Sequence, residues 1–160
     1  MPRPSRRGLA VAVVALLLTS GCAQAPAPAS TSTIDGYDDV EAYAAYVVTS
    51  TNAARADEDL PPLQVSPCAR EAAERRARDL VGEPDLTHAP LDGVIRDCTP
   101  AAKAAENLSR AGAPANEVVE AWLGSPGHRD NLLDPDLTQI GVACVPDADA
   151  LLCSQVFLGP

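Results

Sequence analysis

The first strong periodicity in the chain is helical. Between residues 39 and 55, Val40, Tyr43 and Val47 recur at intervals of three and four residues, and acidic residues stand at the start of the segment. This spacing places the apolar side chains on one helical face, and acidic groups favour the positive end of a helix dipole. The pattern predicts a first helix over residues 39–55.

A second helix is expected after a proline-rich break. Ser66 suits an N-cap, and Pro67 suits the first helical position because the N–H that proline lacks would be unpaired there in any case. The apolar stripe that follows consists mostly of alanine: Ala69, Ala73, Ala77 and finally Leu80. A face of such small side chains lets a helix approach its neighbour closely.

The middle of the chain gives weaker signals and then a third helix. Residues 81–105 mix glycine, proline and aspartate without a period, and residues 106–112 suit a short strand or a turn. Residues 114–124 predict a helix that ends at the glycines and proline of residues 124–127. Its inward side chains are expected to be Val118, Val119, Trp122 and Leu123, with the lone tryptophan in the core.

Two β-prone runs near the C-terminus indicate a hairpin. Residues 138–145 and 151–158 are rich in aliphatic side chains and are joined by the turn-like residues 146–150. No internal repeat is found in the sequence. Helices kept apart from a small antiparallel sheet make the predicted fold a single α+β domain.

The N-terminus carries an export signal. Three arginines precede the apolar residues 8–20, which are too few for a stop-transfer helix. The run ends in "LLLTSGC", which resembles the lipobox of bacterial lipoproteins, and this resemblance implies acylation of Cys22. We therefore expect a lipoprotein signal peptide at residues 1–21, a Pro/Ala/Ser/Thr-rich tether at 22–36 and a folded domain at 37–160. The expected location is the outer face of the bacterial cell membrane, or the medium if plain secretion leaves the cysteine free.

The acidic net charge of the chain argues against nucleic acid as a partner. The chain has 12 basic and 22 acidic residues, and loss of residues 1–21 would remove three basic residues and no acidic one, leaving a net charge of −13. No basic patch is present, so nucleic acid is not an expected partner. An acidic surface is not attracted to anionic lipid, so membrane contact is expected through the N-terminal lipid alone. The oligomeric state is not indicated.

Four cysteines lie in the expected domain. An even number in an exported domain suggests two disulfides, for which Cys68, Cys98, Cys144 and Cys153 allow three pairings. Cys144 and Cys153 lie near the open end of the predicted hairpin and are expected to face each other, and Cys68 is expected to pair with Cys98. No C-x-x-C motif supports a zinc ribbon or a thioredoxin-like site.

The candidate chemistry lies on two histidines. His88 and His128, the only histidines, stand in segments with glycine and proline, where sites are often built on loops. With a carboxylate they could hold zinc or copper, or they could be ordinary surface or hydrogen-bonded residues, because no H-E-x-x-H motif joins them. A triad of Ser125, His128 and Glu106 is a further arrangement, although the serine does not lie in a G-x-S-x-G elbow and also suits a cap before Pro126.

Six segments in order resemble the CAP superfamily, which covers the cysteine-rich secretory, antigen 5 and pathogenesis-related proteins. They are "NAARADEDLPPLQVSPCAREAAERRA", "LTHAP", "AENL", "VVEAWLGSPGHRDNLL", "IGVAC" and "SQVFL". The match runs from about Val47 to Phe157, nearly the whole expected domain. The resemblance implies an α-β-α sandwich with a central cleft, lined in the family by two histidines and two glutamates that can hold a divalent metal, often zinc.

Carried over to this chain, the resemblance implies a metal site of His88, Glu106 and His128. His88 and His128 match the two family histidines, and Glu106 matches the glutamate of the G-E-N motif, where Ala105 replaces the glycine. Ser125 stands where the second glutamate is found, and it can add only a hydroxyl. The break at residues 124–127 would let His128 turn back into the cleft, whose lining is expected to include Ser125, Asn107 and Asn131, the last bonded to backbone in the same turn.

Two functions follow from the resemblance and the residues together. One is a lipid-anchored, non-catalytic binding module whose cleft holds a divalent ion, with zinc as the candidate cofactor, and takes a lipid or cell-envelope component. The other is a metal-dependent hydrolase or protease that uses the same cleft, with metal-bound water as nucleophile and Glu106 as general base. A fold match alone does not transfer a reaction, and no carboxylate is left over for the second role, so the binding module is the favoured interpretation.

Lipid attachment gives a direct prediction. Cys22→Ala removes the acylated residue and should release the chain into the medium, because an acidic domain has no other attraction to the membrane. Fractionation of cells that express the two forms measures this, and retention of the variant in the membrane fraction would rule out the lipid anchor.

Overall fold

The computed structural model describes residues 39–160. The predicted signal peptide, the tether and Cys22 lie outside the described residues, as do positions 37 and 38 of the predicted domain. Within the described part of the chain, no helix is both long and apolar enough to span a membrane.

The three predicted helices are present. Helix α1 spans Val40–Asp57, and its N-cap Asp39 accepts a hydrogen bond from the N–H of Ala42 at 2.9 Å. Helix α2 spans Pro67–Asp79 behind the N-cap Ser66, whose hydroxyl accepts from the N–H of Ala69. Helix α4 spans Ala115–Leu123. Its buried side chains include three of the four expected ones, Val118, Val119 and Trp122, whereas Leu123 is only partly buried.

The structure contains two helices that the sequence did not predict, and one strand that is longer than expected. Helix α3 spans Asp92–Asp97, and helix α5 spans Pro126–Leu132 directly after α4. Strand β2 spans Lys103–Ala111, where only a short strand or turn was expected. All nine of its residues pair with β4, so the strand is maintained by its partner rather than by its alanine-rich sequence.

The sheet has four strands in the order β1-β3-β4-β2. The predicted hairpin is present as β3, Gln139–Asp147, and β4, Ala150–Gly159, and β2 pairs with β4 in the antiparallel sense. The two-residue strand β1, Gln64–Val65, pairs with β3 in parallel, which makes the small sheet mixed rather than purely antiparallel. Strand β2 therefore forms one edge of the sheet.

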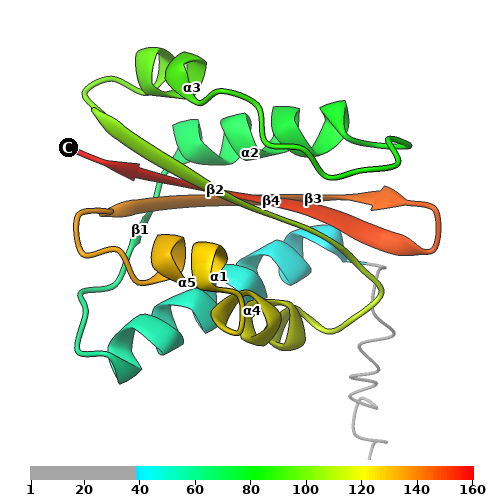
Figure 1. Cartoon of the computed structure of the whole chain (residues 1–160), viewed down its shortest axis with the longest axis horizontal. Coiled ribbons are helices and arrows are strands. Elements are labelled where there is room, and N and C mark those ends of the chain that lie inside the picture. Colours follow the sequence, from blue (N-terminus) through cyan, green and yellow to red (C-terminus); the bar gives the residue numbers. More distant parts are fainter. Residues whose placement is uncertain (1–38) are drawn as a thin grey trace, which may run out of the picture. The chain divides into compact units, whose positions relative to one another are not determined.

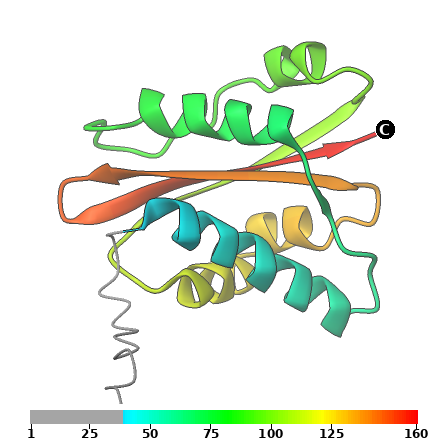
Figure 2. The ribbon, with the colours of Figure 1, turned by 180° about the vertical axis from the view of Figure 1, so that it is seen from behind.

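Helices cover both faces of this sheet. In Figures 1 and 2, α2 and α3 lie on one side of the strands, and α1, α4 and α5 lie on the other. The main core packs α1 and α4 against the inner strands, and a second core lies under the alanines of α2. The predicted α+β sandwich is confirmed.

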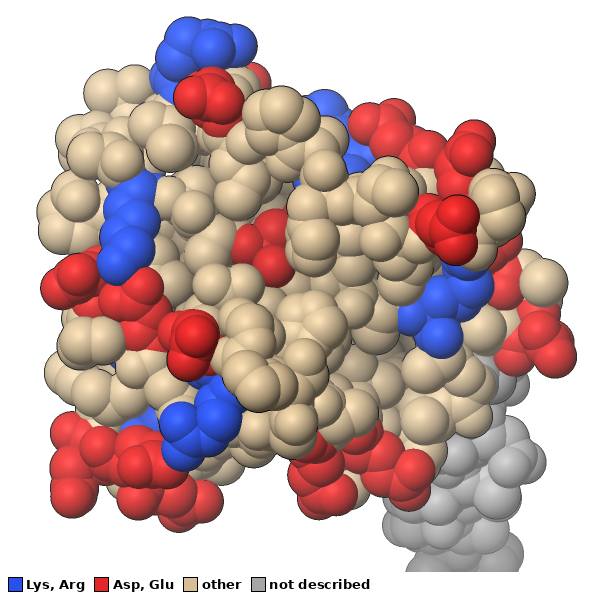
Figure 3. All heavy atoms as spheres, in the orientation of Figure 1, with Lys and Arg blue, Asp and Glu red and all other residues tan. Residues whose placement is uncertain are grey.

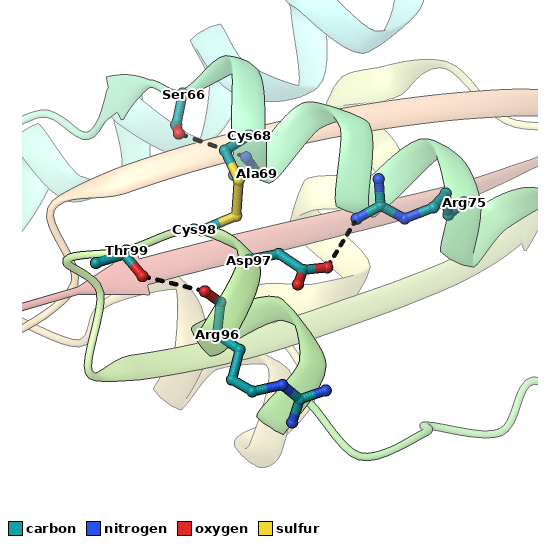
Figure 4. The surroundings of a disulfide bond; sticks show 8 residues. All are labelled: Ser66, Cys68, Ala69, Arg75, Arg96, Asp97, Cys98 and Thr99. Carbon is teal, nitrogen blue, oxygen red and sulfur yellow. Dashed lines mark hydrogen bonds and ion pairs between the residues drawn. A yellow bond between two sulfur atoms is a disulfide. The ribbon is translucent and has the colours of Figure 1, made fainter.

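Both expected disulfides are present. Cys68 at the start of α2 is bonded to Cys98 at the end of α3, as Figure 4 shows, and this bond joins two positions 30 apart in the sequence, with His88 between them. Cys144 and Cys153 face each other across β3 and β4. They lie three pairs from the turn and not at the open end of the hairpin, because both strands continue for five or six residues beyond them.

The alanine stripe of α2 packs directly on strand β3. Ala69, Ala73 and Ala77 are fully buried, and the strand presents Gly141 to them. A Cβ on Gly141 would lie 2.0 Å from the backbone N of Arg70 and 2.2 Å from the carbonyl carbon of Ala69. Backbone meets backbone at this point, so the close approach expected from the small-residue face is confirmed.

This contact makes Gly141→Ala a severe change. The added methyl has to displace helix backbone, and overpacking of this kind costs about 1–3 kcal/mol or more. Urea unfolding of the purified domain measures the loss. Gly127→Ala is the matched control, since nothing lies within 4 Å of its added Cβ and alanine favours the helix in which it stands. Equal stability of the two variants would contradict the close packing.

Candidate functional site

A pocket of about 360 Å³ opens beside the edge strand β2. Its lining comes from three places: the segment between α2 and α3, strand β2, and helix α5 with the residue before it. The lining residues are His88, Leu91, Glu106, Ser125, Gly127, His128 and Asn131. In the orientation of Figure 3, which has β2 and α5 in front, uncharged surface fills the middle of the face and an acidic side chain shows inside a hollow there. The pocket therefore joins both helical layers across the edge of the sheet.

Glu106 lies at the base of this pocket with 1% of its side chain exposed. Arg76 binds its carboxylate with two nitrogens, Nε to Oε1 at 2.5 Å and a terminal nitrogen to Oε2 at 2.6 Å. Ser154 Oγ donates to Oε1 at 3.1 Å, and His88 Nδ1 lies 2.8 Å from Oε2. The carboxylate thus accepts four hydrogen bonds, two at each oxygen, which is its full acceptor capacity.

These contacts determine the ionisation of Glu106 and Arg76. Burial by itself would raise the pKa of Glu106, but the hydrogen bonds and charge of Arg76, together with those from His88 and Ser154, outweigh it and lower the pKa below its usual value. The same hydrogen bond raises the pKa of Arg76. Both groups are charged at neutral pH, and the base of the pocket carries no net charge.

His88 enters the pocket from the segment that follows α2. An ionised carboxylate only accepts hydrogen bonds, so Nδ1 of His88 carries a proton and donates to Glu106. Arg76 also donates to the carbonyl of Ala89 at 3.4 Å. Half of the His88 side chain is exposed. The loop is thus held by the arginine beneath it while its imidazole faces solvent.

His128 lies on a helix and not in the loop that the glycines suggested. Helix α5 begins at Pro126, so the break after α4 is a change of direction between two helices. The ring lies 6.4 Å from that of Trp122, centre to centre. Burial, and secondly the nearby His88, lowers the pKa of His128, so this imidazole is neutral at neutral pH.

Two asparagines connect α5 to the sheet. Asn131 donates to the carbonyl of Glu106 at 3.1 Å and to Oδ1 of Asn107 at 2.9 Å. It therefore bonds to strand β2, and the expectation that it would bond backbone within its own turn was wrong. Asn107 donates to the carbonyl of His128 and to Gln155 on β4. Asn107 is fully buried below the pocket, so it supports the lining without being part of it.

Ser125 lines the pocket but shows no sign of a nucleophile. It occupies the N-cap position of α5, yet its hydroxyl makes no capping hydrogen bond. Among the residues that the structure describes, no hydrogen bond joins this hydroxyl to either histidine. The carboxylate of the supposed triad, Glu106, is bonded to His88 instead of His128. A Ser125–His128–Glu106 triad is therefore not assembled.

The zinc ligand set that the resemblance implied does not fit this arrangement. His88, Glu106 and His128 do line one pocket, as expected. However, all lone pairs of Glu106 are used by protein donors, and within residues 39–160 no group of three or more His, Cys, Asp or Glu side chains is placed to hold a metal ion. Two imidazoles remain as possible ligands, fewer than the three protein ligands of a catalytic zinc site.

Arg76 and Ser154 were missed by the sequence reasoning. Arg76 follows Ala69 by seven residues and Ala73 by three, so it lies on the buried alanine stripe of α2. A charged residue on a buried stripe signals a buried ion pair, and this sign was available in the sequence. Ser154 gave no such sign, since serine is common on either face of a strand.

The ion pair predicts a pH-dependent loss of stability. The pKa of Glu106 is lower in the fold than in the unfolded chain, so its contribution to stability is complete above the unfolded value of about 4.3 and is lost progressively as the pH falls from there through the lower value of the folded state. Glu106→Gln leaves Arg76 buried without its charge partner and should lower the free energy of unfolding by about 2–4 kcal/mol at pH 7. The difference from the parent should shrink at pH 3, as measured by urea unfolding.

Glu74→Gln is the control for this experiment. Glu74 pairs with Arg78 on the exposed side of the same helix, where water screens the charges, so little change is expected at either pH. A deficit of Glu106→Gln that stays equal at both pH values would show that the carboxylate charge is not what the fold depends on.

Comparison with known proteins agrees with this architecture. The model of the cysteine-rich secretory protein (CAP) family matches residues 48–157. The uncharacterized protein YkwD of Bacillus subtilis is 31% identical over 147 residues, which cover 88% of this chain and 56% of that protein. The chain thus spans about half the length of this relative.

Solved structures show the same fold at lower identity. A cysteine-rich secretory protein of Staphylococcus aureus has a TM-score of 0.67 at 20% identity and covers 78% of this chain and 41% of its own. An extracellular SCP-domain protein of Bacillus anthracis has a TM-score of 0.64 at 23% identity, with 75% and 41% covered. An outer surface protein of Borrelia burgdorferi has a TM-score of 0.63 at 21% identity, with 76% and 94% covered. The chain belongs to the cysteine-rich secretory protein (CAP) family.

Proposed function

We propose that the chain is an exported, lipid-anchored binding module whose pocket takes a neutral, hydrogen-bonding group of a lipid or cell-wall component. The observation that carries this proposal is the closed set of bonds around Glu106. It leaves the floor of the pocket without net charge, and the lining offers two imidazoles, a serine hydroxyl and the apolar side chain of Leu91. Such a lining can orient a polar neutral group by hydrogen bonds and apolar contact.

The lining disfavours a hydrolase. A general base needs a free lone pair and a pKa near the working pH, whereas Glu106 has its lone pairs occupied and a lowered pKa. His128 is neutral and could accept a proton, but no hydrogen bond in the described chain directs it toward Ser125. The pocket therefore has groups that bind, without a nucleophile and base arranged to react.

Export and anchoring are supported by independent features. Two disulfides favour an oxidising compartment. The N-terminal segment resembles a lipoprotein signal with Cys22 as the acylated residue. Two of the similar structures are named as an extracellular protein and an outer surface protein. Together these features support a domain held on the outer face of the membrane by a lipid and a short tether.

The binding function is tested by co-sedimentation. The purified chain carrying Cys22→Ala is mixed with insoluble cell-wall polymer or with vesicles of neutral envelope lipid, and the bound fraction is measured. His88→Ala and His128→Ala should each weaken binding by about fivefold, the worth of one lost hydrogen bond. Tyr46→Ala is the control, since this exposed aromatic lies on α1 and not in the pocket.

Two results would contradict the proposal. One is equal binding of both materials by the parent and the two histidine variants. The other is covalent labelling of Ser125 by a serine-reactive fluorophosphonate, which would show an activated nucleophile and favour the hydrolase.

A further inference from the structure

We propose that Arg76 is the built-in cation of this pocket: it occupies the face of Glu106 that a divalent metal would need, so the site works without metal. This inference stands on the geometry around Glu106 and does not depend on which envelope component binds. It also names a single residue whose removal would convert the pocket into a metal site.

The first support is the direction of the Arg76 bonds. The guanidinium contacts both carboxylate oxygens, at 2.5 and 2.6 Å, in the two-pronged geometry that arginine forms with carboxylates. A metal bound through either oxygen would need one of the lone pairs that these bonds use. Ser154 and His88 hold the remaining two. Metal binding therefore requires a protein bond to break first.

The second support is charge. A divalent ion on Glu106 would lie within a few ångströms of the guanidinium, and like charges at this distance repel strongly where water is scarce. The guanidinium cannot relieve the repulsion by losing its proton, because arginine stays protonated in proteins. Arg76 already neutralises the charge of the Glu106 carboxylate, which removes the main attraction for a cation.

The third support is that Arg76 cannot easily move away. Its side chain is 14% exposed and rises from the buried stripe of α2, where the close contact with β3 fixes the helix. It also donates to the carbonyl of Ala89, next to His88. Swinging it out would leave Glu106 as a buried, unpaired charge and release the loop that carries His88. The arginine is therefore a fixed part of the pocket and not a removable surface group.

Removal of the guanidinium leaves a different set of donors. In Arg76→Met the carboxylate of Glu106 keeps only Ser154 and His88 as donors, which frees one lone pair on each oxygen in a pocket that His128 also lines. Two histidines and a carboxylate are a donor set that zinc favours. We therefore expect the variant to gain zinc binding that the parent lacks.

The test is calorimetric titration with zinc chloride, using the full chain with Cys22→Ala so that a free thiol does not bind the ion. Arg76→Met should bind zinc about tenfold or more tightly than the parent, and adding His128→Ala should abolish the gain. Arg75→Met is the matched control: this neighbouring arginine is largely exposed and pairs with Asp97, so its loss should leave zinc binding as in the parent. Arg76→Lys keeps the positive charge and should also stay weak.

A second measurement remains valid if Arg76→Met folds poorly. A metal that binds the native state raises the unfolding temperature, so excess zinc should leave the unfolding temperature of the parent unchanged. A rise that His128→Ala removes would overturn the proposal, because it would show a metal in the pocket with Arg76 in place. A folded Arg76→Met variant that gains no affinity for zinc would overturn it as well.

Discussion

The buried carboxylate of Glu106 is the point on which the pocket depends. Its four donors come from α2, from the loop after α2 and from β4, and its own backbone carbonyl accepts from Asn131 on α5. One residue of the edge strand is thus bonded to both helical layers and to the neighbouring strand. A charge buried this deeply is tolerated only with full pairing, and the pairing holds both histidine-bearing segments in place.

Much of the fold could be predicted from the sequence because its signals are local. Caps such as Ser66 followed by Pro67 mark where helices begin, and the run of alanines on α2 indicates close packing. Helix α5 was missed because it is only seven residues long and contains a glycine, and β2 was underestimated because its extent comes from pairing with β4. Such elements exist through tertiary contacts, which local patterns do not contain.

The residues that line the site could be predicted from the sequence, but the contacts among them could not. The motif order placed His88, Glu106 and His128 together, and the structure places all three at one pocket. The motif order could not show which group each side chain contacts. That depends on Arg76, which no motif named, and on the orientation of α5, which turns Asn131 toward β2 and leaves Asn107 beneath the lining. Residue identity indicated candidate ligands, whereas the bonds around Glu106 determine that its lone pairs are already used.

The packing of α2 and the chemistry of the pocket share one constraint. Gly141 and the alanine stripe bring the backbone of α2 against the sheet, and from the same stripe Arg76 reaches Glu106 on β2, which is separated from β3 by β4. A bulkier residue at the contact would lift the helix and lengthen the Arg76–Glu106 bonds as well as open the core. The small residues of α2 therefore serve both stability and the pocket, since close packing determines whether the carboxylate is neutralised by protein or left free for a cation.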